Sequence, residues 1–246
     1  MFLYPLSQMT GGVFYEHAHR LMGAFVGLSS IFLMVMSIAS ARGALVKIAA
    51  AAAFVLICIQ GVMGGLRVTA ESVVLAILHG INGHIVLSIL ALATLFSTQL
   101  WANARSEPSE HAGKTKQFAI IALVIVFVQI AFGVVARHFP DTLHGVMSHA
   151  GFSIVAASAA VMAGSVAAKN ASHPLLKKLG KASLHTVGLQ MALGVAALGI
   201  VMTMRDQDTP HTLDLILTTT HQIVGALLLA ILTLVVVLTQ RTMRQA

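Results

Sequence analysis

The sequence contains few charged residues. Charged side chains make up 9% of the 246 residues, whereas hydrophobic residues make up 57%. Uninterrupted apolar stretches repeatedly reach the about 20 residues that are needed to cross a hydrocarbon core. This composition predicts an all-α polytopic membrane protein. The net charge of +7 is carried by loops between the apolar stretches, so we do not interpret it as a nucleic-acid-binding surface.

Cysteine is almost absent. The only cysteine is Cys58, so an internal disulfide is excluded. The first residues, MFLYPLSQMTGG, lack the basic start and apolar centre of a cleavable signal peptide. Two tyrosines and one tryptophan contrast with twelve histidines. The high number of histidines is therefore the feature that a functional interpretation has to explain.

Hydropathy predicts seven membrane-spanning helices. They are expected at residues 17–41, 46–67, 73–101, 117–138, 142–168, 178–203 and 211–239. A polar segment that contains a proline, ANARSEPSEHAGKTK, separates the third helix from the fourth. We therefore expect three parts: an N-terminal half-bundle of three spans (1–103), a cytoplasmic linker (104–116) and a C-terminal four-helix half-bundle (117–246).

Loop charges predict the orientation of these spans. Eleven of the fifteen basic residues fall on one side of the predicted membrane, and six of the eight acidic residues fall on the other. Basic loops stay in the cytoplasm. We therefore expect a multi-pass protein of the cell (plasma) membrane, with a cytoplasmic C-terminus and with residue 1 on the outer side.

Two short patterns alternate along the chain. Three spans carry glutamine with glycine four residues later: Gln60 and Gly64, Gln129 and Gly133, and Gln190 and Gly194. The other four spans carry histidine with a small residue four residues later: His19 and Gly23, His79 and Gly83, His149 and Ser153, and His221 and Gly225. Glycine at these positions favours close helix packing, with the glutamine bonded to a partner helix. A small residue one turn from histidine also leaves room for a flat ligand.

The alternation begins with a histidine-type span. A duplicated four-helix unit would need one more glutamine-type span before it. Seven spans with an external N-terminus would also require a short tail to cross the membrane unaided. Both observations lead us to expect that the sequence lacks the first helix of a longer, eight-span protein.

Four histidines are expected at one depth in the membrane. His19, His79, His149 and His221 precede the basic residue at the cytoplasmic end of their spans by 20 to 26 residues. At about 1.5 Å per residue, this distance is close to the thickness of one bilayer core. Neutral imidazole is a common haem ligand, and helix bundles hold such groups between facing helices.

The four histidines therefore predict two bis-histidine haem sites, with the haem iron as the metal. A structural role, in which each histidine bonds a neighbouring helix, is the alternative. Copper or zinc is the less favoured metal because no Cys-x-x-Cys or His-x-x-x-His pair is present. His144 competes with His149 as the ligand in the fifth span. Arg137 or His138, at the end of the fourth span, is placed to meet a haem propionate.

Five segments resemble the haem A synthase family of respiratory membranes. They are EHAHR (16–20), QGVMGGLRVT (60–69), LHG (78–80), QIAFGVVARH (129–138) and TTTHQIVGALLLA (218–230). The resemblance extends over essentially the whole chain, and EHAHR is its most specific element. Members of the family have eight spans in two four-helix halves. Many carry a cysteine pair in outer loops, which this sequence lacks, so no role of those thiols transfers.

The resemblance implies a haem-dependent membrane oxidoreductase. Its reaction would oxidise the methyl group of haem O to the formyl group of haem A, which haem–copper oxidases need. His19 and His79 would hold this substrate and product in the N-terminal half. His149 and His221 would hold a haem b in the C-terminal half. The implied partners are the enzyme that supplies haem O and the assembling haem–copper oxidase; a homo-oligomer is possible, and the electron donor is not indicated.

The resemblance also gives Glu16 a catalytic role. Glu16 lies three residues before His19 and would accept protons or stabilise positive charge during methyl oxidation. Arg20 would pair with a haem propionate. A simple interfacial ion pair is the alternative explanation for both residues. Two other functions stay open at this point: a non-catalytic di-haem electron carrier of the quinol-linked cytochrome b type, and a transporter or assembly factor without haem.

Overall fold

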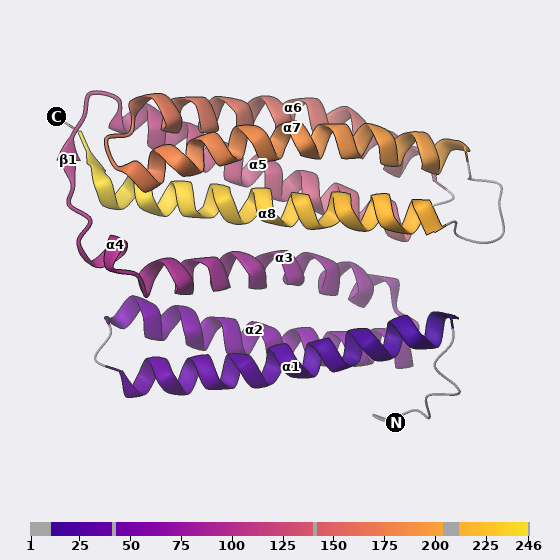
Figure 1. Ribbon diagram of the computed structural model, residues 1–246. Coiled ribbons are helices and arrows are strands. Elements are labelled where there is room, and N and C mark those ends of the chain that lie inside the picture. The colour runs from indigo at the N-terminus through magenta and orange to yellow at the C-terminus, as the bar shows by residue number, and fades with distance from the viewer. Residues whose placement is uncertain (1–10, 41–42, 140–141, 204–211, 246) are drawn as a thin grey trace. The chain divides into compact units, whose positions relative to one another are not determined.

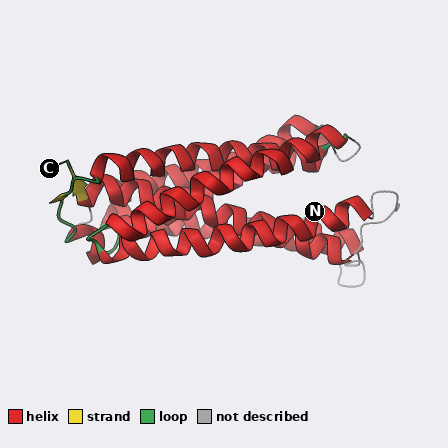
Figure 2. Cartoon of the chain, turned by 90° about the horizontal axis from the view of Figure 1, so that it is seen from above, coloured by secondary structure: helices red, strands yellow, loops and turns green. Residues whose placement is uncertain are grey.

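The computed structural model describes residues 11–40, 43–139, 142–203 and 212–245. The prediction that residue 1 lies on the outer side concerns a segment outside these residues. Within them, nearly all of the chain is helical, as Figure 2 shows.

Seven long helices form the described part of the molecule (Figure 1). They are α1 (Gly11–Ala39), α2 (Ala44–Thr69), α3 (Val73–Phe96), α5 (Ala112–His138), α6 (Leu143–Asn170), α7 (Pro174–Thr203) and α8 (Thr212–Thr242). All seven are long and apolar enough to cross a membrane. The predicted fold class, an all-α polytopic membrane protein with seven spans, is therefore confirmed.

The third predicted span is divided in the structure. We expected one helix over residues 73–101, but α3 ends at Phe96 and a short helix, α4 (Gln99–Ala102), follows. Thr98 has an extended backbone, and its hydroxyl accepts a hydrogen bond from the backbone amide of Trp101 at 3.2 Å. Threonine is a good N-cap residue, so it starts a new helix at this position instead of continuing the old one.

The chain forms two compact units, Met1–Ser97 and Thr98–Ala246. In the first unit, α2 packs against both α1 and α3. The division falls six residues before the end of the predicted N-terminal half (1–103). Part of the predicted linker (104–116) is structured, because it contains a short strand and the start of α5.

The second unit is a ring of four helices. α5 and α7 each pack against both α6 and α8, whereas α6 and α8 lie diagonally and barely touch. Two short strands join the ends of the unit: β1 (Glu107–Pro108) pairs in parallel with β2 (Met243–Arg244). Nearby, the guanidinium of Arg241 lies 5.3 Å from the ring centre of Trp101.

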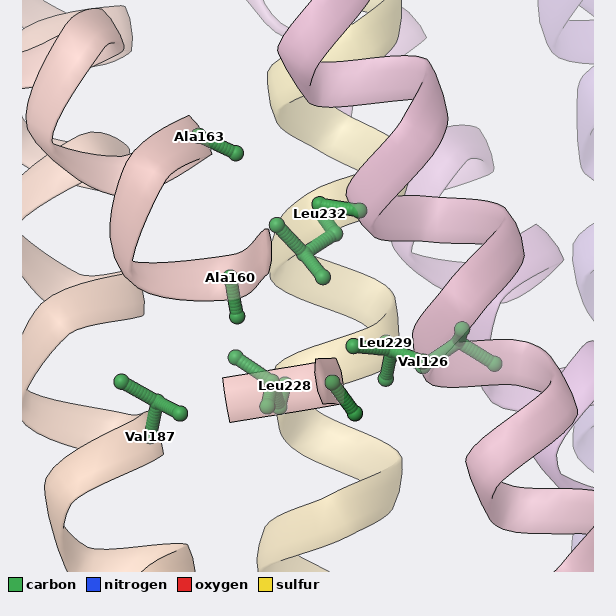
Figure 3. Close-up of a cluster of buried hydrophobic side chains, with 9 residues drawn as sticks. Val126, Ala160, Ala163, Val187, Leu228, Leu229 and Leu232 are labelled. Atoms are coloured by element: carbon green, nitrogen blue, oxygen red, sulfur yellow. The ribbon is translucent and has the colours of Figure 1, made fainter. Parts of the chain in front are cut away.

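The second unit has a buried core of small and branched aliphatic side chains (Figure 3). Its members are Ala122, Val126, Ala156, Ala160, Ala163, Val187, Leu228, Leu229 and Leu232. Helices in a membrane pack through small residues because lipid gives them no hydrophobic incentive to associate. The close contact of α6 with α7 follows this rule: a Cβ on Gly180 would lie only 2.5 Å from the backbone nitrogen of Ala168.

Candidate functional site

The four predicted ligand histidines lie in two pairs. The ring centroids of His19 on α1 and His79 on α3 are 6.2 Å apart. Those of His149 on α6 and His221 on α8 are 6.1 Å apart. The ring planes are steeply inclined, at 71° in the first pair and 90° in the second. The pairing is the one that the sequence predicts, and each unit contains one pair.

The competing histidine of the fifth span lies elsewhere. His144 is exposed in the first turn of α6. His149, which lies five residues further along the helix, is partly buried and is the residue that faces His221.

The separation of the rings fits two ligands on one metal ion. Two metal–nitrogen bonds of about 2 Å each, together with the radii of two imidazole rings, place the ring centroids about 6 Å apart. Both observed separations agree with this value. Among the described residues, no group of three or more His, Cys, Asp or Glu side chains could hold a metal ion. The residues therefore fit a group that brings its own equatorial ligands, such as haem, better than a bare zinc or copper ion.

The second pair lies at one end of the packed core. His149 and His221 come from the diagonal helices of the ring, so their side chains meet across its interior. Core residues Ala156 and Leu228 each follow the histidine of their helix by seven residues, which corresponds to about 10 Å along the axis. The core shown in Figure 3 therefore closes the interior about two turns from the histidines.

Two of the predicted ligand histidines, His79 and His149, are bonded to a glutamine of the preceding helix. The carboxamide of Gln60 donates to the backbone carbonyl of His79 at 3.0 Å, and Nδ1 of His79 lies 3.1 Å from the backbone carbonyl of Gln60. Gln129 and His149 repeat this arrangement, with distances of 2.9 Å and 3.2 Å. The prediction that each glutamine bonds a partner helix is confirmed for these residues.

The third glutamine makes a related contact. The carboxamide nitrogen of Gln190 lies 3.2 Å from Nε2 of His221 itself.

The glycines of the repeat make room for these contacts. A Cβ would lie 3.0 Å from the ring of His79 if placed on Gly64, 2.8 Å from the ring of His149 on Gly133, and 3.0 Å from the ring of His221 on Gly194. Two of the histidine-side glycines, Gly83 and Gly225, face the glutamines instead, whereas a Cβ on Gly23 would meet no atom within 4 Å. A Cβ on Gly83 would lie 3.5 Å from Nε2 of Gln60, and one on Gly225 would lie 3.1 Å from Nε2 of Gln190.

This arrangement changes the explanation of two of the small residues after histidine, Gly83 and Gly225. The sequence led us to expect that they leave room for a flat ligand. The structure instead places a glutamine carboxamide beside Gly83 and Gly225. The hydrogen bonds between glutamine and histidine were missed because a single sequence does not show which neighbouring helix fills the space above a glycine. The matching four-residue spacing on both helices was the available signal.

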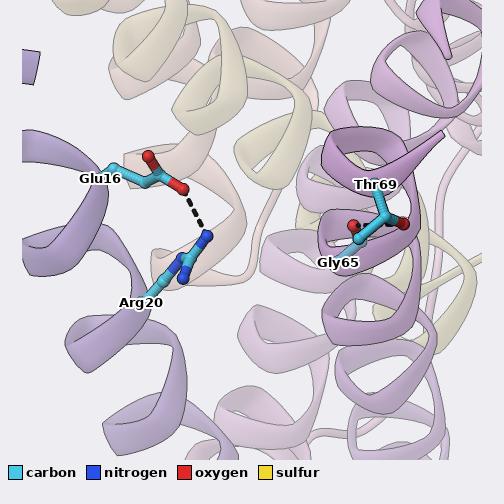
Figure 4. A network of polar contacts seen from close by, with 4 residues as sticks. All are labelled: Glu16, Arg20, Gly65 and Thr69. Atoms are coloured by element: carbon cyan, nitrogen blue, oxygen red, sulfur yellow. Dashed lines mark hydrogen bonds and ion pairs between the residues drawn. The ribbon is translucent and has the colours of Figure 1, made fainter. Parts of the chain in front are cut away.

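The predicted catalytic and propionate-binding residues lie near the histidines in sequence. Glu16 and Arg20 form an ion pair one turn apart on α1 and are both exposed (Figure 4). The same view shows the hydroxyl of Thr69 donating to the backbone carbonyl of Gly65 on α2 at 3.4 Å. Glu16 and Arg20 thus adopt the ion-paired arrangement that the sequence left open as the alternative.

Arg137 has a different partner. Its guanidinium donates to the side-chain oxygen of Gln222 at 2.8 Å. Gln222 directly follows His221 in the sequence, so Arg137 connects α5 to α8 at the turn that carries this predicted ligand.

Comparison with known families supplies the identity of the chain. The family described as cytochrome oxidase assembly protein, COX15-CtaA, matches residues 4–144, which is more than half of the chain. The chain belongs to this family. The matched segment contains Glu16, His19 and His79. No curated protein and no solved structure matches the chain.

Membership in COX15-CtaA gives the chain a role in cytochrome oxidase assembly. His149 and His221 lie beyond the matched residues. The argument for them as ligands therefore rests on the repeat in the sequence and on the geometry of the second unit.

Proposed function

We propose that this protein is a haem A synthase, which oxidises the methyl group of haem O to the formyl group of haem A for haem–copper oxidases. The observation that carries the proposal is the separation of about 6 Å in each of two histidine pairs. Membership in an oxidase assembly family supports the same reaction.

The two pairs would have different tasks. His19 and His79 would hold haem O as the substrate and release haem A. His149 and His221 would hold a haem b, which supplies one-electron chemistry when bound. The protein would contribute ligation, orientation and charge at both places. Arg137, beside His221, would move from Gln222 to a haem propionate, because a guanidinium binds a carboxylate with two parallel hydrogen bonds.

Glu16 and Arg20 distinguish a synthase from a simple electron carrier. With oxygen taken from water, the conversion is –CH3 + H2O → –CHO + 4 H⁺ + 4 e⁻, so it needs an external one-electron acceptor, reached through the haem b, and a base for the protons. Glu16 is a carboxylate within one turn of His19 and would be that base. Binding of a propionate by Arg20 would break the ion pair and free the Glu16 carboxylate. A di-haem electron carrier would also need the four histidines, but the ion pair between Glu16 and Arg20 would have no role in it.

The proposed setting follows the loop charges. The chain would lie in the plasma membrane with its C-terminus in the cytoplasm, so that both histidine pairs lie near the outer surface. The enzyme that makes haem O and the assembling oxidase would be its partners. Self-association would be compatible with this role.

Analysis of bound haem tests the proposal. The protein would be expressed with a haem O supply, purified, and its haems extracted and separated by chromatography. A synthase yields haem b together with haem A or its hydroxylated precursor. Recovery of unmodified haem alone would support the di-haem electron carrier, and an absorption spectrum without haem would support a transporter or a haem-free assembly factor. Either result would contradict the proposal.

A further inference from the structure

The repeated glutamine and glycine residues do more than pack neighbouring helices together. We propose that each Gln-x-x-x-Gly element positions the ligand histidine of the next helix and selects its tautomer before haem binds. The best-defined cases are Gln60 with Gly64, acting on His79, and Gln129 with Gly133, acting on His149. We call each such group an imidazole clamp. The haem part of the inference rests on the proposed function, whereas the tautomer part does not.

The first step is the exposure of a backbone acceptor. In a helix, the side chain of residue i+4 lies over the carbonyl of residue i. Glycine at i+4 removes that cover. The ring of His149 can therefore approach until Nδ1 is 3.2 Å from the carbonyl oxygen of Gln129. A Cβ on Gly133 would lie 2.8 Å from Cε1 of this ring, so any larger residue would displace the imidazole.

The second step is the choice of tautomer. A backbone carbonyl can only accept a hydrogen bond, so Nδ1 of His149 must be the protonated nitrogen. Nε2 then keeps its lone pair. The same reasoning applies to His79, whose Nδ1 lies 3.1 Å from the carbonyl of Gln60. A neutral imidazole with a free Nε2 is the form that binds iron, and a hydrogen bond at Nδ1 increases its basicity.

The third step is the fixed position of the histidine backbone. The carboxamide of Gln129 donates to the carbonyl of His149 at 2.9 Å, so one residue contacts both the ring and the main chain of the ligand. In the first unit, the carboxamide is itself held. Asn82, which is buried, donates to Oε1 of Gln60 at 2.7 Å and to the carbonyl of Leu56 at 3.0 Å.

Spacing explains why both glutamine and glycine are needed. Glutamine supplies a main-chain acceptor and a side-chain donor at one level of the helix, and glycine opens the surface above that acceptor. The third element, Gln190 with Gly194, has the same spacing, but its carboxamide contacts the ring of His221 directly. The first two elements therefore provide the clearer test.

The haem-free protein tests the tautomer directly. Protein labelled with ¹⁵N-histidine would be reconstituted in lipid, and the ring nitrogens would be observed by solid-state NMR, with His149→Ala used to assign the signal. We expect an Nδ1-protonated His149 that loses this state in Gly133→Ala. Gly188→Ala is the matched control, because a Cβ on Gly188 would have no neighbour within 4 Å. An Nε2-protonated His149 in the unaltered protein would overturn the inference.

Haem binding supplies a second readout. Second-sphere partners of a metal ligand typically change metal affinity by about 10- to 100-fold. We expect haem titration to show a loss of this size in Gly133→Ala and in Gln129→Met, together with a higher reduction potential of the residual haem in Gly133→Ala. Gln117→Met is the control, because Gln117 is exposed on the same helix. Electron paramagnetic resonance of the ferric form should report a changed angle between the imidazole planes.

The two proposals fail in different ways. If His149→Ala removes haem while Gly133→Ala and Gln129→Met leave affinity, potential and tautomer unchanged, the clamp is wrong and the haem site stands. If the protein binds no haem but His149 shows the Gly133-dependent tautomer, the proposed function is wrong and the tautomer part of the clamp stands. A loss of haem in Gly133→Ala with an unchanged NMR tautomer and a lower thermal stability of the haem-free protein would indicate mere misfolding and overturn the clamp.

Discussion

At the scale of single residues, the site consists of four imidazoles, each in contact with a second imidazole. The ligand candidates are arranged in pairs, and His79 and His149 each exchange hydrogen bonds with a glutamine. Glu16 and Arg20 stand apart from this group, because they are exposed and bonded to each other. Exposed ion pairs contribute little to stability, so this contact costs little to break.

Glu16→Gln should separate haem binding from chemistry. The amide keeps the size of the side chain but cannot accept a proton, so haem content should stay normal while haem A production falls by about 10²- to 10⁴-fold. Chromatography of extracted haem measures both quantities. Glu71→Gln is the matched control, because Glu71 is an exposed carboxylate between α2 and α3. Normal haem A production by Glu16→Gln would remove Glu16 from the mechanism.

The residue types of the site and the pairing of its histidines could be predicted, but the contacts of each ring with the neighbouring helix could not. Counting residues to the basic end of each span gives the depth of His149 and His221, because a helix rises by a constant amount per residue. The direction in which each ring points depends on packing against other helices. The same limit explains why Gly83 and Gly225 were linked to a flat ligand, whereas glutamine side chains lie above them.

At the scale of elements, close packing of small residues holds the second unit together. α6 and α7 approach so closely at Gly164 and Gly180 that a Cβ on either glycine would lie less than 3 Å from backbone atoms of the other helix. Backbone atoms cannot move aside as a flexible side chain can. This contact therefore fixes how α6, which carries His149, is placed against its neighbour.

Gly180→Ala should destabilise the second unit. Alanine favours a helix, but the added Cβ would lie 2.5 Å from the backbone nitrogen of Ala168, and such overpacking costs about 1–3 kcal/mol. Thermal unfolding in detergent measures the change. Gly188→Ala on the same helix should instead leave stability equal or slightly higher, since its Cβ would meet no atom within 4 Å. Equal melting temperatures for the two variants would show that the contact between α6 and α7 does not require glycine at position 180.

Element boundaries show which local signals the sequence contains. The long helices follow from hydropathy, because only a helix satisfies its own backbone polar groups within lipid. The break after Phe96 was missed because Leu100 and Trp101 extend the apolar span beyond the polar Ser97, Thr98 and Gln99. The cap at Thr98 depends on a backbone geometry that hydropathy does not register. The pairing of β1 with β2 was also unexpected, since it joins segments more than 130 residues apart in the chain.

At the scale of the whole molecule, the chain is an integral membrane protein whose described residues form seven long helices in two compact units, each with one histidine pair. The number of helices could be predicted because the thickness of the membrane sets the length of each span. The alternation of glutamine-type and histidine-type helices could be predicted because the repeat is read directly from the sequence. The diagonal relation of α6 and α8 was not, because several arrangements of four helices are compatible with the same spans.

Cysteine labelling should establish the orientation of the chain. Replacing the single cysteine, Cys58, leaves a cysteine-free background in which Ser106→Cys and Ala70→Cys can be compared, both at exposed positions between spans. The loop charges predict that a membrane-impermeant thiol reagent added to intact cells modifies residue 70 and spares residue 106. After cell lysis, both should react. The opposite pattern in intact cells would reverse the proposed orientation.

The central claim is that each unit holds one haem between two histidines. Electron paramagnetic resonance of the purified ferric protein, loaded with haem O and haem b, tests it most directly. The account predicts two low-spin bis-imidazole signals: one lost in His19→Ala and His79→Ala, the other in His149→Ala and His221→Ala. A high-spin spectrum in the unaltered protein, or alanine variants that retain both signals, would contradict it.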